Sequence, residues 1–166
     1  MNSRSFAFPD RPGYLILEEP VLTHMYEHAQ VRGHQKEAGG QLFSSAPQHE
    51  IVITSKATGP YATDHRSRHA FNPDPLQATL DRKSLFGHGL YPIGLWHTHP
   101  ESNPNPSGRD RQTTAEFLKA FNGDLNGFVL AILGNHGHPL ALTLWLATVN
   151  NKWLEMKEII NYKSGC

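Results

Sequence analysis

The stretch Gly94-Leu95-Trp96-His97-Thr98-His99-Pro100 decides the fold, because it ends the strand that the sequence predicts most strongly, 91–99. Side chains two positions apart on a strand point to the same face. Leu95, His97 and His99 therefore form one row that runs from the core to the end of the strand, where Pro100 stops it. Two imidazoles on one face can converge on a metal ion, although two ordinary polar residues at a strand end would show the same pattern.

A carboxylate follows at the start of the next predicted helix. The loop 100–106 leads into Ser107-Gly108-Arg109-Asp110, and Ser-x-x-Asp is the pattern of a capping box, in which Ser107 and Asp110 exchange hydrogen bonds with the first turn. A carboxylate held in that turn is also rigid. Beside two imidazoles, Asp110 would complete a site of three protein ligands, which leaves one zinc position for water, as in catalytic zinc sites.

Hydrolysis of an amide also needs a group that accepts a proton and then delivers it to the leaving amine. Glu37 is the candidate, in the segment Glu37-Ala38-Gly39-Gly40-Gln41-Leu42 before a predicted strand. The two glycines permit close approach of another backbone segment. From spacing alone, Glu37 is equally well interpreted as a solvated loop carboxylate.

The order of predicted elements indicates a mixed α/β domain built on a single curved mixed β-sheet flanked by helices. Polar residues 64–69 form a loop or an edge, and the amphipathic tail 152–160 fits either a helix or a strand. Residues 1–18 form an N-terminal arm that includes a short apolar piece, and residues 19–166 form the domain. The expected elements are a helix over 19–31, strands over 40–44 and 50–57, a helix over 74–86, a strand over 91–99, a helix over 108–121, and strands over 127–133 and 140–148.

The composition excludes several classes of protein. Basic and acidic residues are balanced at 15 each among 166, whereas domains that bind nucleic acid usually carry a basic surplus, so we expect no nucleic-acid partner. The apolar runs 128–133 and 140–147 are far shorter than the ~20 residues that cross a bilayer, and the N-terminus lacks the apolar core of a signal peptide. We therefore expect no membrane association. The single cysteine, Cys166, allows no disulfide within the chain, which favours the cytoplasm.

Three dispersed pieces of sequence together resemble the JAMM signature of MPN-type metalloproteases. They are Glu37-x-Gly39-Gly40, His97-x-His99-Pro100 and Ser107-x-x-Asp110, with the seven residues 100–106 between His99 and Ser107. The resemblance implies a JAB/MPN (cytidine deaminase-like) fold and a zinc isopeptidase or peptidase that acts on ubiquitin-like conjugates. By the same resemblance, His97, His99 and Asp110 would bind Zn²⁺, Glu37 would be the general acid/base, and Ser107 would stabilise the oxyanion.

The chain is also similar to the stand-alone prokaryotic JAB peptidases. The similarity lies in Gly59-Pro60, in the segment ending Phe71-Asn72-Pro73-Asp74, and in the compact length. Some of those peptidases accompany bacterial relatives of ubiquitin-activating and ubiquitin-conjugating enzymes in anti-phage (CBASS-type) systems. This likeness implies a ubiquitin-like protein or its conjugates as partners, association with activating and conjugating enzymes, and a role in antiviral defence.

Three classes of function follow from these residues. The first is an active zinc isopeptidase. The second is a peptidase that trims the precursor of a ubiquitin-like or sulfur-carrier protein. The third is a non-catalytic MPN-like binding module, which usually lacks one or more metal ligands; here every position of the signature is filled, which disfavours it.

The remaining histidines and cations carry competing interpretations. His24-Met25-Tyr26-Glu27-His28 matches His-x-x-Glu-His, an inverzincin pattern with both imidazoles on one helix face, but the amphipathic helix 19–31 explains it as well. Trp96 alternates away from the histidine row and is expected in the core. The loop histidines and the basic residues are expected on a solvated face, although the basic residues could instead meet an acidic partner. These residues are His65, His69, His136 and His138, and Arg66, Arg68, Arg82 and Lys83.

Overall fold

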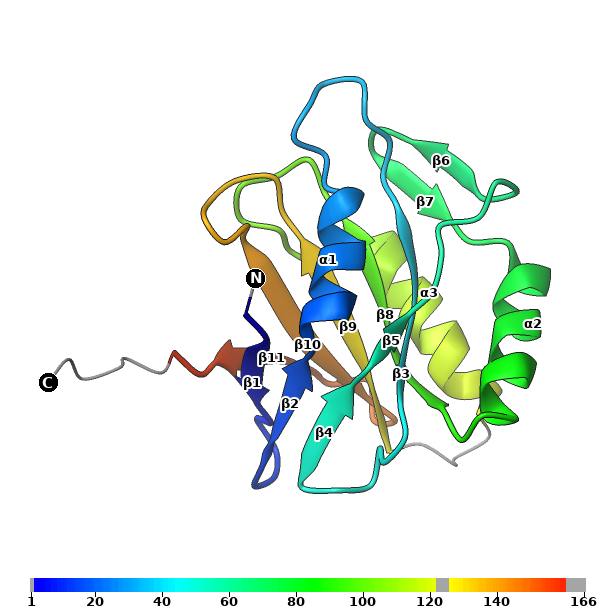
Figure 1. Cartoon of the computed structure of the whole chain (residues 1–166), viewed down its shortest axis with the longest axis vertical. Coiled ribbons are helices and arrows are strands. Elements are labelled where there is room, and N and C mark those ends of the chain that lie inside the picture. Colours follow the sequence, from blue (N-terminus) through cyan, green and yellow to red (C-terminus); the bar gives the residue numbers. More distant parts are fainter. Residues whose placement is uncertain (1, 122–125, 161–166) are drawn as a thin grey trace, which may run out of the picture.

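A strongly curved sheet and three helices make up the part of the chain that the computed structural model describes, residues 2–121 and 126–160 (Figure 1). The helices are α1 (Glu19–Glu27), α2 (Pro75–Phe86) and α3 (Gly108–Ala120). The strands are β1 (Arg4–Ala7), β2 (Tyr14–Leu17), β3 (Gly39–Ser44), β4 (Ile51–Thr54), β5 (Lys56–Ala57), β6 (His65–Ser67), β7 (Ala70–Asn72), β8 (Tyr91–Thr98), β9 (Gly127–Leu133), β10 (Leu142–Thr148) and β11 (Trp153–Glu158).

The main sheet curls until its two ends meet. Its strand order is β4-β2-β1-β11-β10-β9-β8-β3-β5, so the two outermost strands, β4 and β5, are neighbours in sequence. Ser55 lies between them, and its N–H donates to the carbonyl oxygen of Phe43 at 3.1 Å. We expected one strand over 50–57; it is divided here because the chain exchanges its parallel pairing with β2 for antiparallel pairing with β3. The predicted single curved mixed sheet is confirmed.

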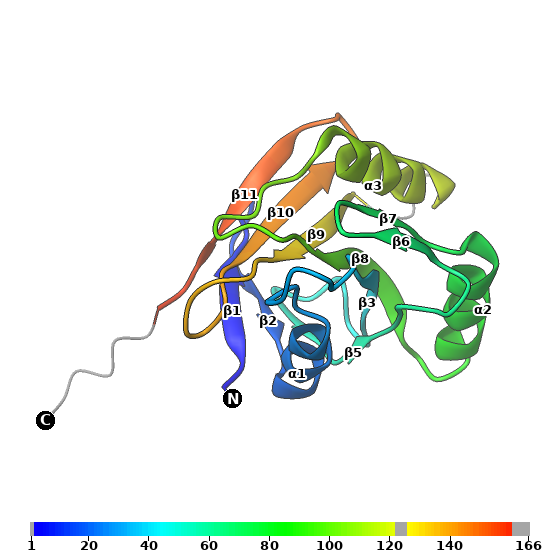
Figure 2. The same cartoon turned by 90° about the horizontal axis from the view of Figure 1, so that it is seen from above.

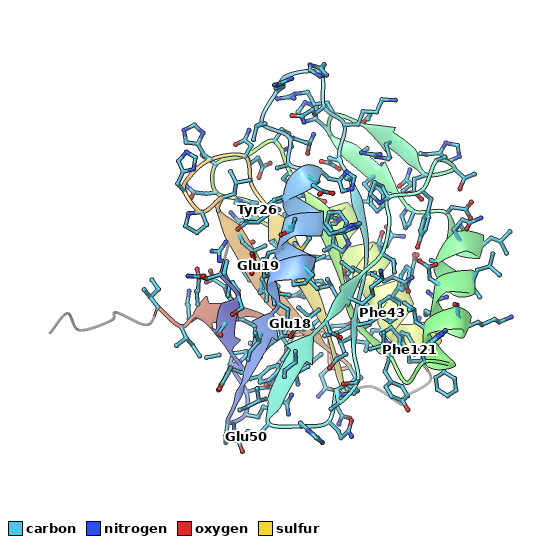
Figure 3. All side chains as sticks on the ribbon, viewed as in Figure 1. Glu18, Glu19, Tyr26, Phe43, Glu50 and Phe121 are labelled. Carbon is cyan, nitrogen blue, oxygen red and sulfur yellow. The ribbon has the colours of Figure 1, made fainter. Side chains whose placement is uncertain are left out.

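Strand β8 lies at the centre of the molecule, paired antiparallel with β3 and parallel with β9. Helix α1 lies inside the curl of the sheet and α3 lies against its outer face (Figure 2). Trp96 of β8 is fully buried in the inner core, as its position in the strand predicts. The outer core joins α3 to β8 and β9, and Phe121, labelled in Figure 3 near the end of α3, packs on Phe128 with ring centroids 5.8 Å apart.

The structure corrects several element assignments. Helix α1 ends at Glu27 rather than at residue 31, because the N–H of His28 folds back onto Met25 O. Of the two alternatives for 64–69, a loop or an edge, the structure shows the edge: residues 65–67 form β6, which pairs with β7 in a separate hairpin. The tail 152–160, for which helix and strand were both left open, forms β11, whose backbone pairs antiparallel with β10 and β1.

The N-terminal segment contributes two strands to the main sheet. Residues 4–7, for which we predicted no strand, form β1, and the apolar piece 14–17 forms β2. Phe6 is buried in the inner core. Within residues 2–121 and 126–160, none of the helices combines the length and hydropathy that a membrane crossing requires. Cys166 lies outside the described residues.

Candidate metal centre and active site

The structure brings His97, His99 and Asp110 together at the end of β8. One potential ligand atom from each of the three side chains lies within 4.8 Å of the others, and all three residues are buried. The Nε2 atom of His97 is 3.3 Å from Asp110 Oδ1, and the Nε2 atom of His99 is 3.3 Å from Asp110 Oδ2. The imidazole rings stack with centroids 5.2 Å apart, as two side chains on one face of a strand should.

The chemistry of this group fits a metal ion. His97 Nε2 and His99 Nδ1 are buried without a hydrogen-bond partner, and such atoms are rare in proteins unless they have a functional role. Two imidazole nitrogens and one carboxylate oxygen form a ligand set that zinc accepts, with a position left open. His97, His99 and Asp110 are therefore the residues that could hold a metal here.

The pKa values of His97 and Asp110, but not that of His99, are shifted towards the protonation states that metal ligands need. Burial lowers the pKa of His97 to about 4, so its ring is neutral at pH 7. Burial alone would raise the pKa of Asp110, but His99, His97 and Ser107 together hold it far below its usual range. Burial alone would lower the pKa of His99, but the neighbouring Asp110 carboxylate raises it above its usual value. A neutral imidazole and an ionised carboxylate are the forms that bind metal.

The capping box at the start of α3 fixes the Asp110 carboxylate. Ser107 Oγ accepts from the N–H of Asp110 at 3.2 Å, and the N–H of Ser107 donates to Asp110 Oδ2 at 2.6 Å. The capping-box interpretation is thus confirmed. The Asp110 carboxylate that takes part in the box also faces the two imidazoles. Ser107 itself is exposed, and its role in catalysis stays a prediction.

Glu37 is buried beside the three side chains without belonging to their cluster. Its backbone is held by the hairpin on both sides: its N–H donates to Ser67 O at 2.8 Å, and its carbonyl oxygen accepts from Arg66 Nε at 2.5 Å. Charges on His99 and Asp110 act on its carboxyl group. The alternative of a solvated loop carboxylate is therefore wrong for Glu37.

Burial raises the pKa of Glu37 from its usual 4.5 to about 7, against the opposing charge of His99. A group that must accept a proton and then release it works best when its pKa lies near the working pH. The environment of Glu37 therefore suits a general acid/base at neutral pH.

The raised pKa of Glu37 predicts a pH-dependent effect on stability in the zinc-free protein. The stability associated with the protonated carboxyl group is complete below the unfolded pKa of 4.5 and is lost as the pH rises through about 7. Because glutamine stays neutral, Glu37→Gln is expected to gain on the order of 2–3 kcal/mol over wild type between pH 5 and pH 8. Urea unfolding of both proteins at the two pH values measures this. A constant difference would contradict the raised pKa.

The hairpin that holds Glu37 was not predicted from the sequence. Arg66 and Arg68 were interpreted as a solvated face or a contact for an acidic partner, yet both donate to backbone carbonyls, Arg68 Nη1 to Gly33 O at 2.8 Å. Arg82 likewise donates to Gln41 Oε1. Residues 65–72 read His-Arg-Ser-Arg-His-Ala-Phe-Asn, without alternation of polar and apolar side chains, so no local pattern indicated the hairpin.

The other histidines lie apart from the metal centre. His24 Nε2 is 2.7 Å from Gly59 O, and the ring of His28 stacks on Trp96. In the described part of the chain these two imidazoles belong to no group of three potential metal ligands, which favours the amphipathic-helix interpretation over the inverzincin pattern. The four histidines predicted to be solvated are exposed: His65, which lies in β6, and His69, His136 and His138.

A curved mixed sheet that carries two histidines at the end of a central strand, with an aspartate from the following helix, defines a JAB/MPN-type domain. The chain belongs to the family described as prokaryotic homologs of the JAB domain, whose model matches residues 18–147. This confirms the family that the dispersed signature predicted.

Individual proteins with similar sequences or structures agree with this assignment. A CD-NTase/cGAS isopeptidase from Pseudomonas aeruginosa is 36% identical over 110 residues, which cover 64% of this chain and 69% of that protein. The deubiquitinase MYSM1 from Homo sapiens is 35% identical over 69 residues, 40% of this chain and 8% of that protein. The solution structure of a protein from Desulfitobacterium hafniense has a TM-score of 0.60 at 18% identity, covering 86% of this chain and 88% of that one, and supports the fold alone.

Proposed function

We propose that this protein is a zinc-dependent isopeptidase that cleaves after the C-terminus of a ubiquitin-like modifier and so removes it from conjugates. The observation that carries the proposal is the buried His97-His99-Asp110 group with the Glu37 carboxyl group beside it. The similarity to a CD-NTase/cGAS isopeptidase supports an isopeptide substrate. The similarity to a deubiquitinase supports a ubiquitin-like modifier.

The ligand set and Glu37 divide the chemistry between them. His97, His99 and Asp110 would hold Zn²⁺, which supplies Lewis acidity when bound, lowering the pKa of water and polarising the scissile carbonyl group. Glu37 accepts the proton of the attacking water at its carboxylate and then donates it to the leaving lysine amine. The exposed hydroxyl of Ser107 donates a hydrogen bond to the oxygen on which negative charge develops.

The biological setting that we propose follows the named relative. A CD-NTase-like target is what the name of that relative suggests. From the resemblance to stand-alone prokaryotic JAB peptidases, the modifier would be a bacterial ubiquitin-like protein, attached by associated activating and conjugating enzymes in anti-phage defence. We place this reaction in the cytoplasm, which is consistent with a sequence that contains a single cysteine and thus no internal disulfide.

A matched pair of substrates tests the proposal. In one, the C-terminal glycine of a ubiquitin-like protein is joined to a lysine Nε of a CD-NTase; in the other, the same two proteins form a linear fusion. Zinc-loaded enzyme is expected to cleave the lysine conjugate faster than the fusion. Preference for the fusion would indicate a processing peptidase, and binding of zinc-loaded protein to both substrates without cleavage would indicate a non-catalytic module.

Replacing Ser107 by alanine separates its two roles. Loss of an oxyanion donor is expected to lower kcat by ~10²–10³, whereas loss of the N-cap alone costs about 1 kcal/mol of stability. Turnover and urea unfolding of Ser107→Ala are measured together. A variant that is less stable by that amount but turns over at the wild-type rate would leave Ser107 with the capping role only.

A further inference from the structure

The side chain between the two histidines of the ligand strand faces away from the metal centre. Thr98 is fully buried on the α1 side of β8, where it meets Gln30, whose exposed fraction is 1%. The Thr98 hydroxyl accepts from the N–H of Ala38 at 3.0 Å and donates to Gln30 Oε1 at 3.1 Å. Ala38 directly follows Glu37, so this hydroxyl joins the ligand strand to the segment that carries the candidate acid/base.

Gln30 extends the network to the hairpin. Its Nε2 atom donates to Arg68 O at 2.8 Å and to Gln35 O at 3.2 Å. The direction of every hydrogen bond in the network is determined. The carbonyl oxygens of Arg68 and Gln35 can only accept, so the Gln30 amide nitrogen faces them. The Thr98 hydroxyl accepts from Ala38 and therefore donates its own proton to Gln30 Oε1. The network therefore has one arrangement of donors and acceptors.

These bonds surround the backbone of Glu37. On one side, Ala38 is paired with Thr98 through both its N–H and its carbonyl oxygen, which accepts from Thr98 N at 2.9 Å. On the other side, Glu37 N–H is paired with Ser67 of the hairpin, whose neighbour Arg68 is bound by Gln30. Thr98 and Gln30, which are distant from each other in sequence, thus link the position of Glu37 to that of the strand bearing the two histidines.

We propose that Thr98 and Gln30 are positioning residues, which hold the Glu37 carboxyl group at a fixed place relative to the two histidine ligands. This inference rests on the function proposed above. Both side chains are buried and neither belongs to the group of potential ligands, so their contribution is to position groups that do react. A displacement of about 1 Å between reacting groups can lower a rate by ~100-fold.

The test compares variants that change one hydroxyl or one amide. Thr98→Val and Gln30→Met are expected to lower kcat by ~10- to 100-fold, with KM within a few-fold of wild type and zinc retained. Thr98→Ser keeps the hydroxyl and is expected to restore kcat. The matched control is Thr54→Val, because Thr54 is equally buried and its hydroxyl has no partner; it is expected to turn over like wild type.

A second measurement tests the hydrogen bond between Ala38 and Thr98 without relying on turnover. The backbone amide of Ala38 is expected to exchange with solvent deuterium at least ~10-fold faster in Thr98→Val than in Thr54→Val, because it loses its acceptor. If Thr98→Val yields no folded protein, the kcat of Gln30→Met decides by the same criterion.

The outcomes distinguish this inference from the proposed function. If Thr98→Val or Gln30→Met turns over within twofold of Thr54→Val while Glu37→Gln is inactive, the positioning role is refuted and the function stands. If Glu37→Gln is itself active, the proposed mechanism fails first. If KM rises while kcat is unchanged, the network shapes substrate binding and the positioning role is refuted as well.

Discussion

Replacing Glu37 by glutamine is expected to abolish cleavage of a ubiquitin-like conjugate while the protein keeps one zinc ion per chain. General acid/base groups contribute ~10²–10⁴ to rate, and no other carboxyl group is buried beside the three ligands in the described residues. The side chain lies outside the cluster of potential ligands, so its loss should leave the metal in place. Turnover and zinc content, measured on the same preparation, test both parts of the expectation.

The control for Glu37→Gln is a carboxylate that lies close to the same ligands but is exposed. Glu101 Oε2 is 3.8 Å from His99 Nδ1, and its side chain is 55% exposed. Glu101→Gln removes the same charge near the site, and we expect it to retain turnover within a few-fold of wild type. An active Glu37→Gln enzyme would refute the proposed role of Glu37, and a zinc-free one would make Glu37 a metal ligand instead of a base.

Replacing His97 by alanine is expected to remove both zinc and activity. His97 is neutral at pH 7, buried, and supplies one of the three potential ligand atoms that the described residues bring together. Removing a ligand should weaken zinc binding by at least the ~100-fold that loss of an outer-shell partner can cause. Metal analysis after dialysis against a chelator gives the affinity, and conjugate cleavage gives the activity.

His24→Ala is the matched control for His97→Ala. His24 is a half-buried histidine that is likewise paired with a second imidazole, and it contacts Trp96, the neighbour of His97, at a centroid separation of 5.5 Å. We expect this variant to keep its zinc. If zinc persisted in His97→Ala and disappeared in His24→Ala, the metal site would lie on α1 instead of at the end of β8.

Much of the site could be predicted from the sequence because its parts depend on local geometry. Alternation along a strand places His97 and His99 on one face, and the Ser-x-x-Asp spacing places Asp110 in the first turn of a helix. The helices 75–86 and 108–120 and the strands 91–98 and 127–133 agree with the predicted segments within two residues. These elements could be predicted because the residues that set the periodicity and the caps of each element are close together in sequence.

Other features became visible only in the tertiary structure. The sequence predicts one strand over 50–57, but closure of the curved sheet divides it between β2 and β3. Residues 4–7 are too short and too polar to predict a strand, yet they pair with β2 and β11. Whether Glu37 was a solvated carboxylate or a buried base was undecided, and the hairpin that pairs with its backbone settled its burial.

The sequence by itself thus determined the donor types, their spacing and the faces on which they lie. Tertiary structure alone decided the partners: which backbone closes over Glu37, and which side chain joins it to the ligand strand. The physical reason is that a hydrogen bond such as that between Thr98 and Gln30 links residues 68 positions apart. Its formation depends on how the chain packs between them, and no local pattern of residues records that packing.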